Sequence, residues 1–419
     1  MMVLEKYSIG VGDRFAHQGQ AQLRTLIKAK ERGIDIVPVW NKSHREHIAT
    51  GTSPMDVRRE ADDAVKSLRW NDSYYVDADH IGLKNVDLFI ESSDFFTIDV
   101  ADFAGQAADK SDIRAFIHKH SRYTGDLAIP ALEKSFSVTE SQIEDISRRF
   151  LAAVKEAGRI YRHIEAAKGK GNFITEISMD ETETPQTPVE MFFILAAIAH
   201  EDIPAQTIAP KFTGRFNKGV DYAGDVAQFA EEFEADVAVI ALAIAEFGLP
   251  GNLKLSVHSG SDKFSIYRPI NRIIRKHDAG LHLKTAGTTW LEELIGLAMS
   301  GVEGLTIAKD IYKMALARFD ELCAPYAAVV DIDKSLLPSR EAVDAWTGED
   351  YANSLRHDAS CASYNPSFRQ LLHVAYKIAA EMGERYLSAL KEFRDVIGKN
   401  VTDNIYQRHV QPVFGDETY

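Results

Sequence analysis

The chain alternates short apolar runs with longer segments whose apolar residues recur at helical spacing. Each of eight such runs, rich in β-branched or aromatic residues, precedes a helical stretch: 7–11, 35–40, 74–77, 95–100, 173–177, 205–209, 253–257 and 281–284. Strands that alternate with helices form parallel sheets, because a return to the same edge needs a crossover. Eight units predict a closed (β/α)8 barrel, with an open doubly wound sheet as the alternative.

Helix-start signals support this order of elements. Ser53 precedes Pro54, which predicts an N-cap followed by a proline in the first turn. Thr187 and Glu190 have the spacing of a capping box. The segments between the predicted strands therefore have the ends expected of helices.

The length of 419 residues exceeds that of a plain barrel. We expect one barrel domain over 1–419 that carries two additions. One is a helical insertion after the fourth strand, at about 111–170. The other is a C-terminal helical extension at about 302–419.

Charge and cysteine content limit the expected binding partners and the cellular compartment. Lys and Arg total 48 against 62 Asp and Glu, a net charge of −14, which argues against nucleic-acid and membrane partners. Two cysteines, no zinc-type spacing and no leader-like N-terminus predict a cytoplasmic protein. The longest apolar stretch, 237–245, is too short to span a bilayer.

Polar residues gather where the predicted strands end, which is where a barrel has its active site. They are Asp13, Arg14, Lys42, Asp79, His80, Glu176, Asp180, Lys211, His258, Ser259, Ser261, Lys263 and Lys284. Charged groups are tolerated there only if they are paired, bound to metal or facing a wet cleft. Any single basic residue among them can also be an ordinary solvated charge.

Two of these segments indicate a metal site. His80 and His258 each end a predicted strand, and Glu176 offers a carboxylate, a ligand set that suits Zn²⁺, Mn²⁺, Ni²⁺ or Co²⁺. Ser259 and Ser261 offer hydroxyls for a polyol or an anion. The alternative to a metal site is that each histidine is a structural residue, hydrogen-bonded within a turn. The pattern resembles class II aldolases. In these enzymes an Asp-His pair supplies a catalytic acid/base and a metal ligand, and a later histidine supplies a second ligand.

Five segments together resemble the tagaturonate/fructuronate epimerase family of hexuronate catabolism: 7–15, 38–44, 77–81, 257–263 and 282–288. The resemblance implies a metal-dependent isomerase that inverts C3 of a 5-keto-hexonate. C3 is β to the ketone, so simple enolisation does not make its C–H acidic. Retro-aldol cleavage of C3–C4 followed by re-addition inverts C3. Transient oxidation would need a nicotinamide, and no GxGxxG fingerprint follows a strand.

Roles follow from this resemblance as hypotheses. His80, His258 and Glu176 hold the metal, and Glu176 also counts among the catalytic groups. Asp79 moves the C3 hydroxyl proton, while Lys284 or Asp13 serves the opposite face. Ser259 and Ser261 contact the sugar. The candidates for the substrate carboxylate are Arg14, Lys42, Lys211 and Lys263.

Two other functions remain open from the sequence. A class II-type sugar-acid aldolase would release a separate aldehyde. A non-catalytic barrel that binds sugar acids would tolerate loss of Asp79. The metal, the preferred direction of reaction and the oligomeric state, including a homo-oligomer, also stay open.

Overall fold

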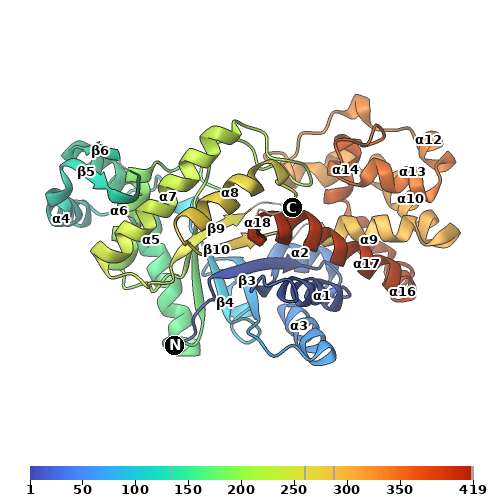
Figure 1. Ribbon diagram of the computed structural model, residues 1–419, viewed down its shortest axis with the longest axis horizontal. Helices are drawn as coiled ribbons and strands as arrows, with labels where there is room; N and C mark the ends of the chain where they lie inside the picture. Colours follow the sequence, from blue (N-terminus) through green and yellow to red (C-terminus); the bar gives the residue numbers. More distant parts are fainter. Residues whose placement is uncertain (133, 259–260, 286–287, 417–419) are drawn as a thin grey trace.

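The computed structural model describes residues 1–132, 134–258, 261–285 and 288–416. Eight parallel strands form a closed barrel in the order β1-β2-β3-β4-β7-β8-β9-β10, and β10 pairs with β1 (Figure 1). Their bounds are Tyr7–Gly12, Val37–Ser43, Tyr75–Ile81, Phe95–Asp99, Ile174–Ser178, Thr207–Ala209, Lys254–His258 and Leu281–Lys284. The predicted (β/α)8 barrel is confirmed.

The barrel interior changes from apolar to polar along the strands. Near the N-terminal ends it holds an apolar cluster made of Leu4, Val37, Val39, Tyr75, Phe95 and Ile174. Because side chains alternate between the two faces of a strand, the next inward position lies two residues further on. Those positions hold buried polar side chains: Asn41, Asp77, Thr97 and Glu176. The sequence therefore builds a polar layer near the C-terminal end of the barrel.

Helices that follow the barrel strands cover the outside of the barrel. They are α1 (Gly19–Lys30), α2 (His44–Thr50), α3 (Pro54–Leu68), α5 (Glu140–Lys168), α6 (Pro188–His200), α7 (Val226–Phe247), α8 (Phe264–Lys276) and α9 (Thr288–Ala298). The predicted capping box at the start of α6 is present: the Glu190 amide donates to Thr187 Oγ1 over 3.2 Å, and the Thr187 amide donates to the Glu190 carboxylate over 2.7 Å.

The segment between β4 and β7 is not wholly helical. After α4 (Lys110–His120), it forms an antiparallel hairpin from β5 (Gly125–Ile129) and β6 (Lys134–Val138), which precedes α5. The hydrophobic pattern missed this hairpin because only Leu127, Ile129 and Val138 of its two short strands are buried. The hairpin stands at one end of the molecule (Figure 1).

The C-terminal extension lies at the opposite end (Figure 1). It comprises α10 (Gly301–Ala317), α11 (Phe319–Cys323), α12 (Arg340–Ala345), α13 (Gly348–Leu355), α14 (Pro366–Val374), α15 (Tyr376–Met382), α16 (Glu384–Glu392), α17 (Arg394–Asn404) and α18 (Gln411–Phe414). Its last helices return to the barrel. The Asn271 side chain of α8 donates to the carbonyls of Val413 and Gly415, and the Phe414 ring lies 5.3 Å from that of Tyr7.

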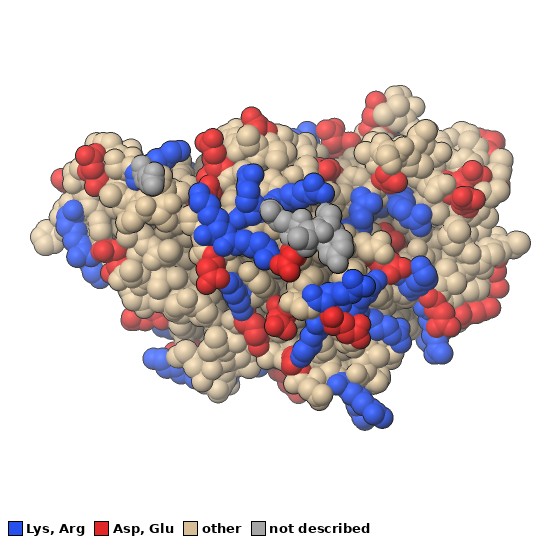
Figure 2. Space-filling model, viewed as in Figure 1, with Lys and Arg blue, Asp and Glu red and all other residues tan. Residues whose placement is uncertain are grey.

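Charge is unevenly distributed despite the net value of −14. On the face shown in Figure 2, Lys and Arg gather over α8, whose exposed basic residues are Arg268, Arg272, Arg275 and Lys276. Arg275 pairs with Asp416 at 3.0 Å. Within the described ranges, no helix combines the length and the apolar character needed to cross a bilayer.

The contact between α9 and α17 depends on a glycine. An added Cβ on Gly296 would lie 2.7 Å from the Cα of Ile397. We expect Gly296→Ala to destabilise the protein by about 1–3 kcal/mol because the backbone of α17 cannot yield locally. Gly398→Ala is the matched control, since its Cβ would meet only Ala21 at 3.6 Å. It should be neutral or stabilising by up to about 1 kcal/mol. Urea unfolding of both variants measures this, and equal midpoints would contradict it.

Candidate active site

Lys284 lies at the centre of the polar layer. Its Nζ is 2.9 Å from carboxylate oxygens of Asp77 and Asp79 and 3.2 Å from Glu176, and it donates to Thr97 Oγ1 over 2.6 Å. These side chains come from β10, β3, β7 and β4, and all are nearly or wholly buried. One ammonium thus faces three carboxylates.

This charge excess sets the protonation of the layer. Burial alone would lower the pKa of Lys284, but the three carboxylates outweigh it and raise that pKa well above 10.5. Burial raises the pKa of Asp79, yet Lys284 and His80 outweigh burial and lower it to about 2. For Asp77, burial outweighs Lys284, and the neighbouring carboxylates help to raise the pKa to about 6. At neutral pH the layer is therefore anionic and attracts cations.

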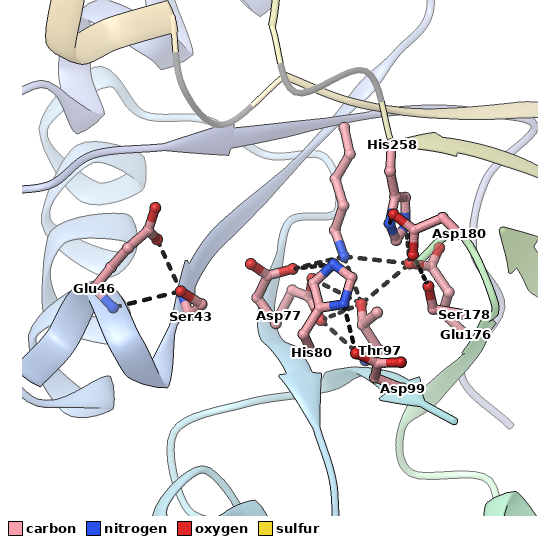
Figure 3. Close-up of polar contacts among 12 residues, drawn as sticks. Ser43, Glu46, Asp77, His80, Thr97, Asp99, Glu176, Ser178, Asp180 and His258 are labelled. Carbon is pink, nitrogen blue, oxygen red and sulfur yellow. Dashed lines mark hydrogen bonds and ion pairs between the residues drawn. The ribbon is translucent and has the colours of Figure 1, made fainter. Parts of the chain in front are cut away.

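Two histidines stand at the C-terminal edge of this layer, each anchored by a carboxylate (Figure 3). His80 Nδ1 lies 3.2 Å from Asp99, and His258 Nε2 lies 2.8 Å from Glu176. The two rings are 5.1 Å apart. A carboxylate behind an imidazole fixes the ring and its tautomer, as is usual for histidines that bind metal.

Asp180 completes a group with these two rings. Ligand atoms of His80, Asp180 and His258 all lie within 4.8 Å of one another. His258 Nδ1 is buried and lies 3.1 Å from the Asp180 carboxylate. Two imidazoles and one carboxylate form a ligand set that suits a divalent transition metal.

The backbone at His80 is strained. Its φ is +51°, in a region that non-glycine residues rarely adopt, and the pairing of β3 with β4 shifts register between Ala78 and Ile81. Such strain persists only where the surroundings impose it, and it is common at functional sites. The bulge turns His80 toward Asp99 and His258.

Burial lowers the pKa of His80, but Asp79, Asp99 and Asp180 outweigh it and raise the pKa to about 10. Burial likewise lowers that of His258, and Asp180 and Glu176 raise it to about 9. Without a competing cation, both rings are protonated at neutral pH. A metal would take the place of those protons.

Glu176 and Asp180 take different positions around His258. Glu176 is fully buried behind His258, where Lys284, Thr97 and Thr207 also donate to its carboxylate. Asp180, two residues beyond the end of β7, lies in the metal-type group instead. Sequence reasoning noted Asp180 only as a polar residue after a strand. Its position in the following loop was the one available signal.

Other candidates contact backbone groups. The Asp13 carboxylate accepts amide protons from Phe15, Ala16, His17 and Gln18, so it closes the turn after β1. Three lysines, Lys42, Lys211 and Lys263, each donate to at least one main-chain carbonyl. Their role in binding substrate stays a prediction.

The loop after β9 is tied to the C-terminal extension. Asp262 pairs with His357 at 3.1 Å, with His409 at 3.2 Å and with Arg369. These partners are distant in sequence, so no local pattern could reveal them. In the same loop, Ser261 is buried with a φ of +83°, and Ser259 falls outside the described residues.

Fold and site together define a (β/α)8-barrel enzyme with a metal-type cluster at the C-terminal ends of its strands. Residues 1–411 match the family described as UxaE: tagaturonate epimerase, and the chain belongs to this family. It is therefore an epimerase.

Known relatives agree with this placement. The tagaturonate/fructuronate epimerase of Thermotoga maritima is 28% identical over 424 residues, which span 97% of this chain and 81% of that protein. The fructuronate-tagaturonate epimerase UxaE of Cohnella laeviribosi has the same fold. Its native structure superposes with a TM-score of 0.78 at 23% identity, covering 99% of this chain and 82% of the other. A complex with one glycerol gives 0.80 at 24% identity, covering 98% and 82%.

Lys284→Met tests the charge balance of the layer. It leaves three buried carboxylates without their cation, so we expect a loss of about 3–5 kcal/mol of unfolding free energy near neutral pH. Lys284 depresses the pKa values of Asp79 and Glu176 in the folded state. That stabilisation is present at pH values above the pKa values that Asp79 and Glu176 have in the unfolded chain, and it is lost as the pH falls through their folded-state pKa values.

The deficit should therefore shrink between about pH 8 and about pH 5, as the stranded carboxylates take up protons. Urea titrations of metal-free protein at both pH values measure it. The control is Lys399→Met, which removes an exposed pair with Asp403 and should change stability by under about 1 kcal/mol at either pH. A deficit that does not depend on pH would contradict the assignment.

Proposed function

We propose that the protein interconverts D-tagaturonate and D-fructuronate by retro-aldol cleavage and re-addition at C3, with the help of a divalent cation. Membership of the tagaturonate epimerase family supports the substrates. The single observation that carries the chemistry is the group of His80, Asp180 and His258 beside the Lys284–carboxylate layer.

His80, Asp180 and His258 would hold the cation, and Asp99 and Glu176 would orient the two rings from behind. The buried Nδ1 of His258, which faces the Asp180 carboxylate at 3.1 Å, fits this role. When bound, Zn²⁺, Mn²⁺, Ni²⁺ or Co²⁺ supplies Lewis-acid stabilisation of the negative charge that develops on the ketone oxygen.

Asp79 is the group best suited to move the proton. It is ionised at neutral pH, and its side chain is 13% exposed, whereas those of Asp77 and Glu176 are wholly buried. Asp79 accepts the proton of the C3 hydroxyl as the C3–C4 bond breaks. The bonding electron pair moves into C4–C5, and C3 becomes an aldehyde carbon.

Rotation of that aldehyde and re-addition from its other face restore the C3–C4 bond with inverted configuration. Asp79 then returns the proton to the new C3 alkoxide, so no electron leaves or enters the substrate. Lys284, at 2.9 Å from Asp79, keeps this carboxylate ionised and in place. A closed, water-poor barrel mouth would hold the two fragments together for recombination.

The ligand assignment predicts an order among carboxylate variants. Asp180→Asn should abolish tight Mn²⁺ or Zn²⁺ binding, as should His258→Ala, because each removes a direct ligand. Glu176→Gln should weaken binding only about 10- to 100-fold, since Glu176 acts through His258. Calorimetric titration measures this, with the exposed Glu144→Gln as a control that binds normally. If Asp180→Asn binds the metal normally while Glu176→Gln does not, the third metal ligand is Glu176 and not Asp180.

Substrate deuterated at C3 separates cleavage from oxidation. Retro-aldol chemistry never breaks the C3–H bond, so tagaturonate should become fructuronate with the label retained and with a rate ratio near one. Oxidation at C3 breaks that bond and would give a primary isotope effect. NMR of the product mixture reads both conversion and label, and loss of deuterium would exclude the retro-aldol route.

A further inference from the structure

A second group of charges lies between the barrel mouth and the C-terminal extension. Arg14 follows β1, Arg45 is in α2, and Lys218 is in the loop between β8 and α7. The extension supplies Tyr326 and Tyr376, whose hydroxyls are 2.7 Å apart. This set, together with His373 of α14, is called the seam cluster below.

The tyrosine rings form a platform for the cations. The Arg14 guanidinium lies 5.1 Å from the Tyr376 ring, while Arg45 and Lys218 lie 4.9 and 5.7 Å from the Tyr326 ring. The Lys218 amide donates to the Val329 carbonyl over 2.8 Å, which fixes its loop against the extension. Cation–π contacts of this kind hold the cations in place against the rings.

Positive charge dominates this cluster. Glu46 pairs with Arg14 at 2.9 Å. Elsewhere in the described chain, no carboxylate lies within ion-pair distance of Arg45 or Lys218. Burial lowers the pKa of Lys218, and Arg45 and Arg14 lower it further against the pull of Glu46. Arg45 is exposed to solvent, whereas Lys218 is only partly exposed, so Lys218 is the cation of this cluster that most calls for an anion.

His373 adds a buried donor. It is only 2% exposed, and its Nε2 has no hydrogen-bond partner among the described residues. Its ring packs against Gly219, next to Lys218. Burial and the charges of Lys218, Arg14 and Arg369 hold its pKa well below 6.5, so the ring is neutral. A neutral imidazole beside cations can donate one N–H to an anion.

The cluster is linked to the strand next to Asp79 through Glu46, the ion-pair partner of Arg14. Ser43 of β2 pairs in register with Asp79 of β3, and Glu46 follows Ser43 in the first turn of α2. Figure 3 shows Ser43 and Glu46 beside the strand that carries Asp77 and His80. In a hexonate, one carbon separates the carboxylate from C3. An anion site beside Asp79 is therefore where the carboxylate must lie if Asp79 serves the C3 hydroxyl.

We propose that Lys218, His373 and Arg14 bind the carboxylate of the sugar acid, on a platform that the C-terminal extension supplies through Tyr326 and Tyr376. The inference rests on the proposed function and adds Lys218 and His373 to the site. In this arrangement the extension helps the enzyme to select acids over neutral sugars.

The test compares an acid with its neutral counterpart. D-galactonate and galactitol are titrated into the metal-loaded enzyme and into Lys218→Met. We expect the wild type to prefer galactonate, and Lys218→Met to bind it about 10- to 100-fold more weakly. Galactitol binding should not change. Lys218→Arg should retain most of the preference.

Lys334→Met is the matched control, because Lys334 also lies over a ring of the extension, 4.2 Å from Phe319, but at the exposed surface beside Asp320. It should bind both compounds normally. If Lys218→Met does not fold, Lys218→Gln takes its place.

Unchanged galactonate binding in the Lys218 variant, or no preference in the wild type, overturns the seam cluster as a carboxylate site. That outcome leaves tagaturonate conversion by the wild type untouched. The opposite outcome is also distinguishable. If the wild type prefers galactonate and Lys218→Met loses that preference, the anion site stands. If the same wild-type enzyme does not interconvert tagaturonate and fructuronate, the proposed function is overturned.

Discussion

Buried ion pairs between Lys284 and the carboxylates of Asp77, Asp79 and Glu176 hold together the polar layer at the mouth of the barrel. Charges in a protein interior are tolerated only when their partners are held in place. Here the lysine and its carboxylate partners come from three strands, β10, β3 and β7, so the register of the closed barrel decides whether the layer can exist. The apolar cluster below holds β3 and β7 from the other end, through Tyr75 and Ile174. Packing and electrostatics therefore favour the same strand register.

The carboxylate excess also organises the cation site. Glu176 serves two partners at once, Lys284 and His258, and so links the lysine layer to the histidine group. Asp79 lies between Lys284 at 2.9 Å and His80 at 3.9 Å. Removal of any one charge would shift the pKa values of the others, because they share a medium of low dielectric. Asp79, proposed to move the proton, and the residues proposed to hold the cation therefore form one electrostatic unit.

The sequence predicted those features of the fold and the site that leave a pattern among neighbouring residues. All eight barrel strands were predicted, because apolar runs between capped helices are local patterns. The hairpin was missed because few of its residues are buried. The grouping of His80 with His258 followed from barrel topology, which brings strand ends together. Asp180 lies in a loop, and Lys218 and His373 meet only through the extension, so no local pattern predicts their proximity.

The fold also separates charge in a way that suits an anionic substrate. A protein with a net charge of −14 repels a sugar acid at long range, and salt screens that repulsion beyond about 10 Å. At short range the acidic layer would repel the carboxylate but attract a cation. The seam cluster carries the opposite, positive charge, and one small molecule would span the two regions. A substrate with a carboxylate at one end and a ketone at the other can bind in only one direction across such a gradient, and that orientation would bring its C3 hydroxyl to Asp79.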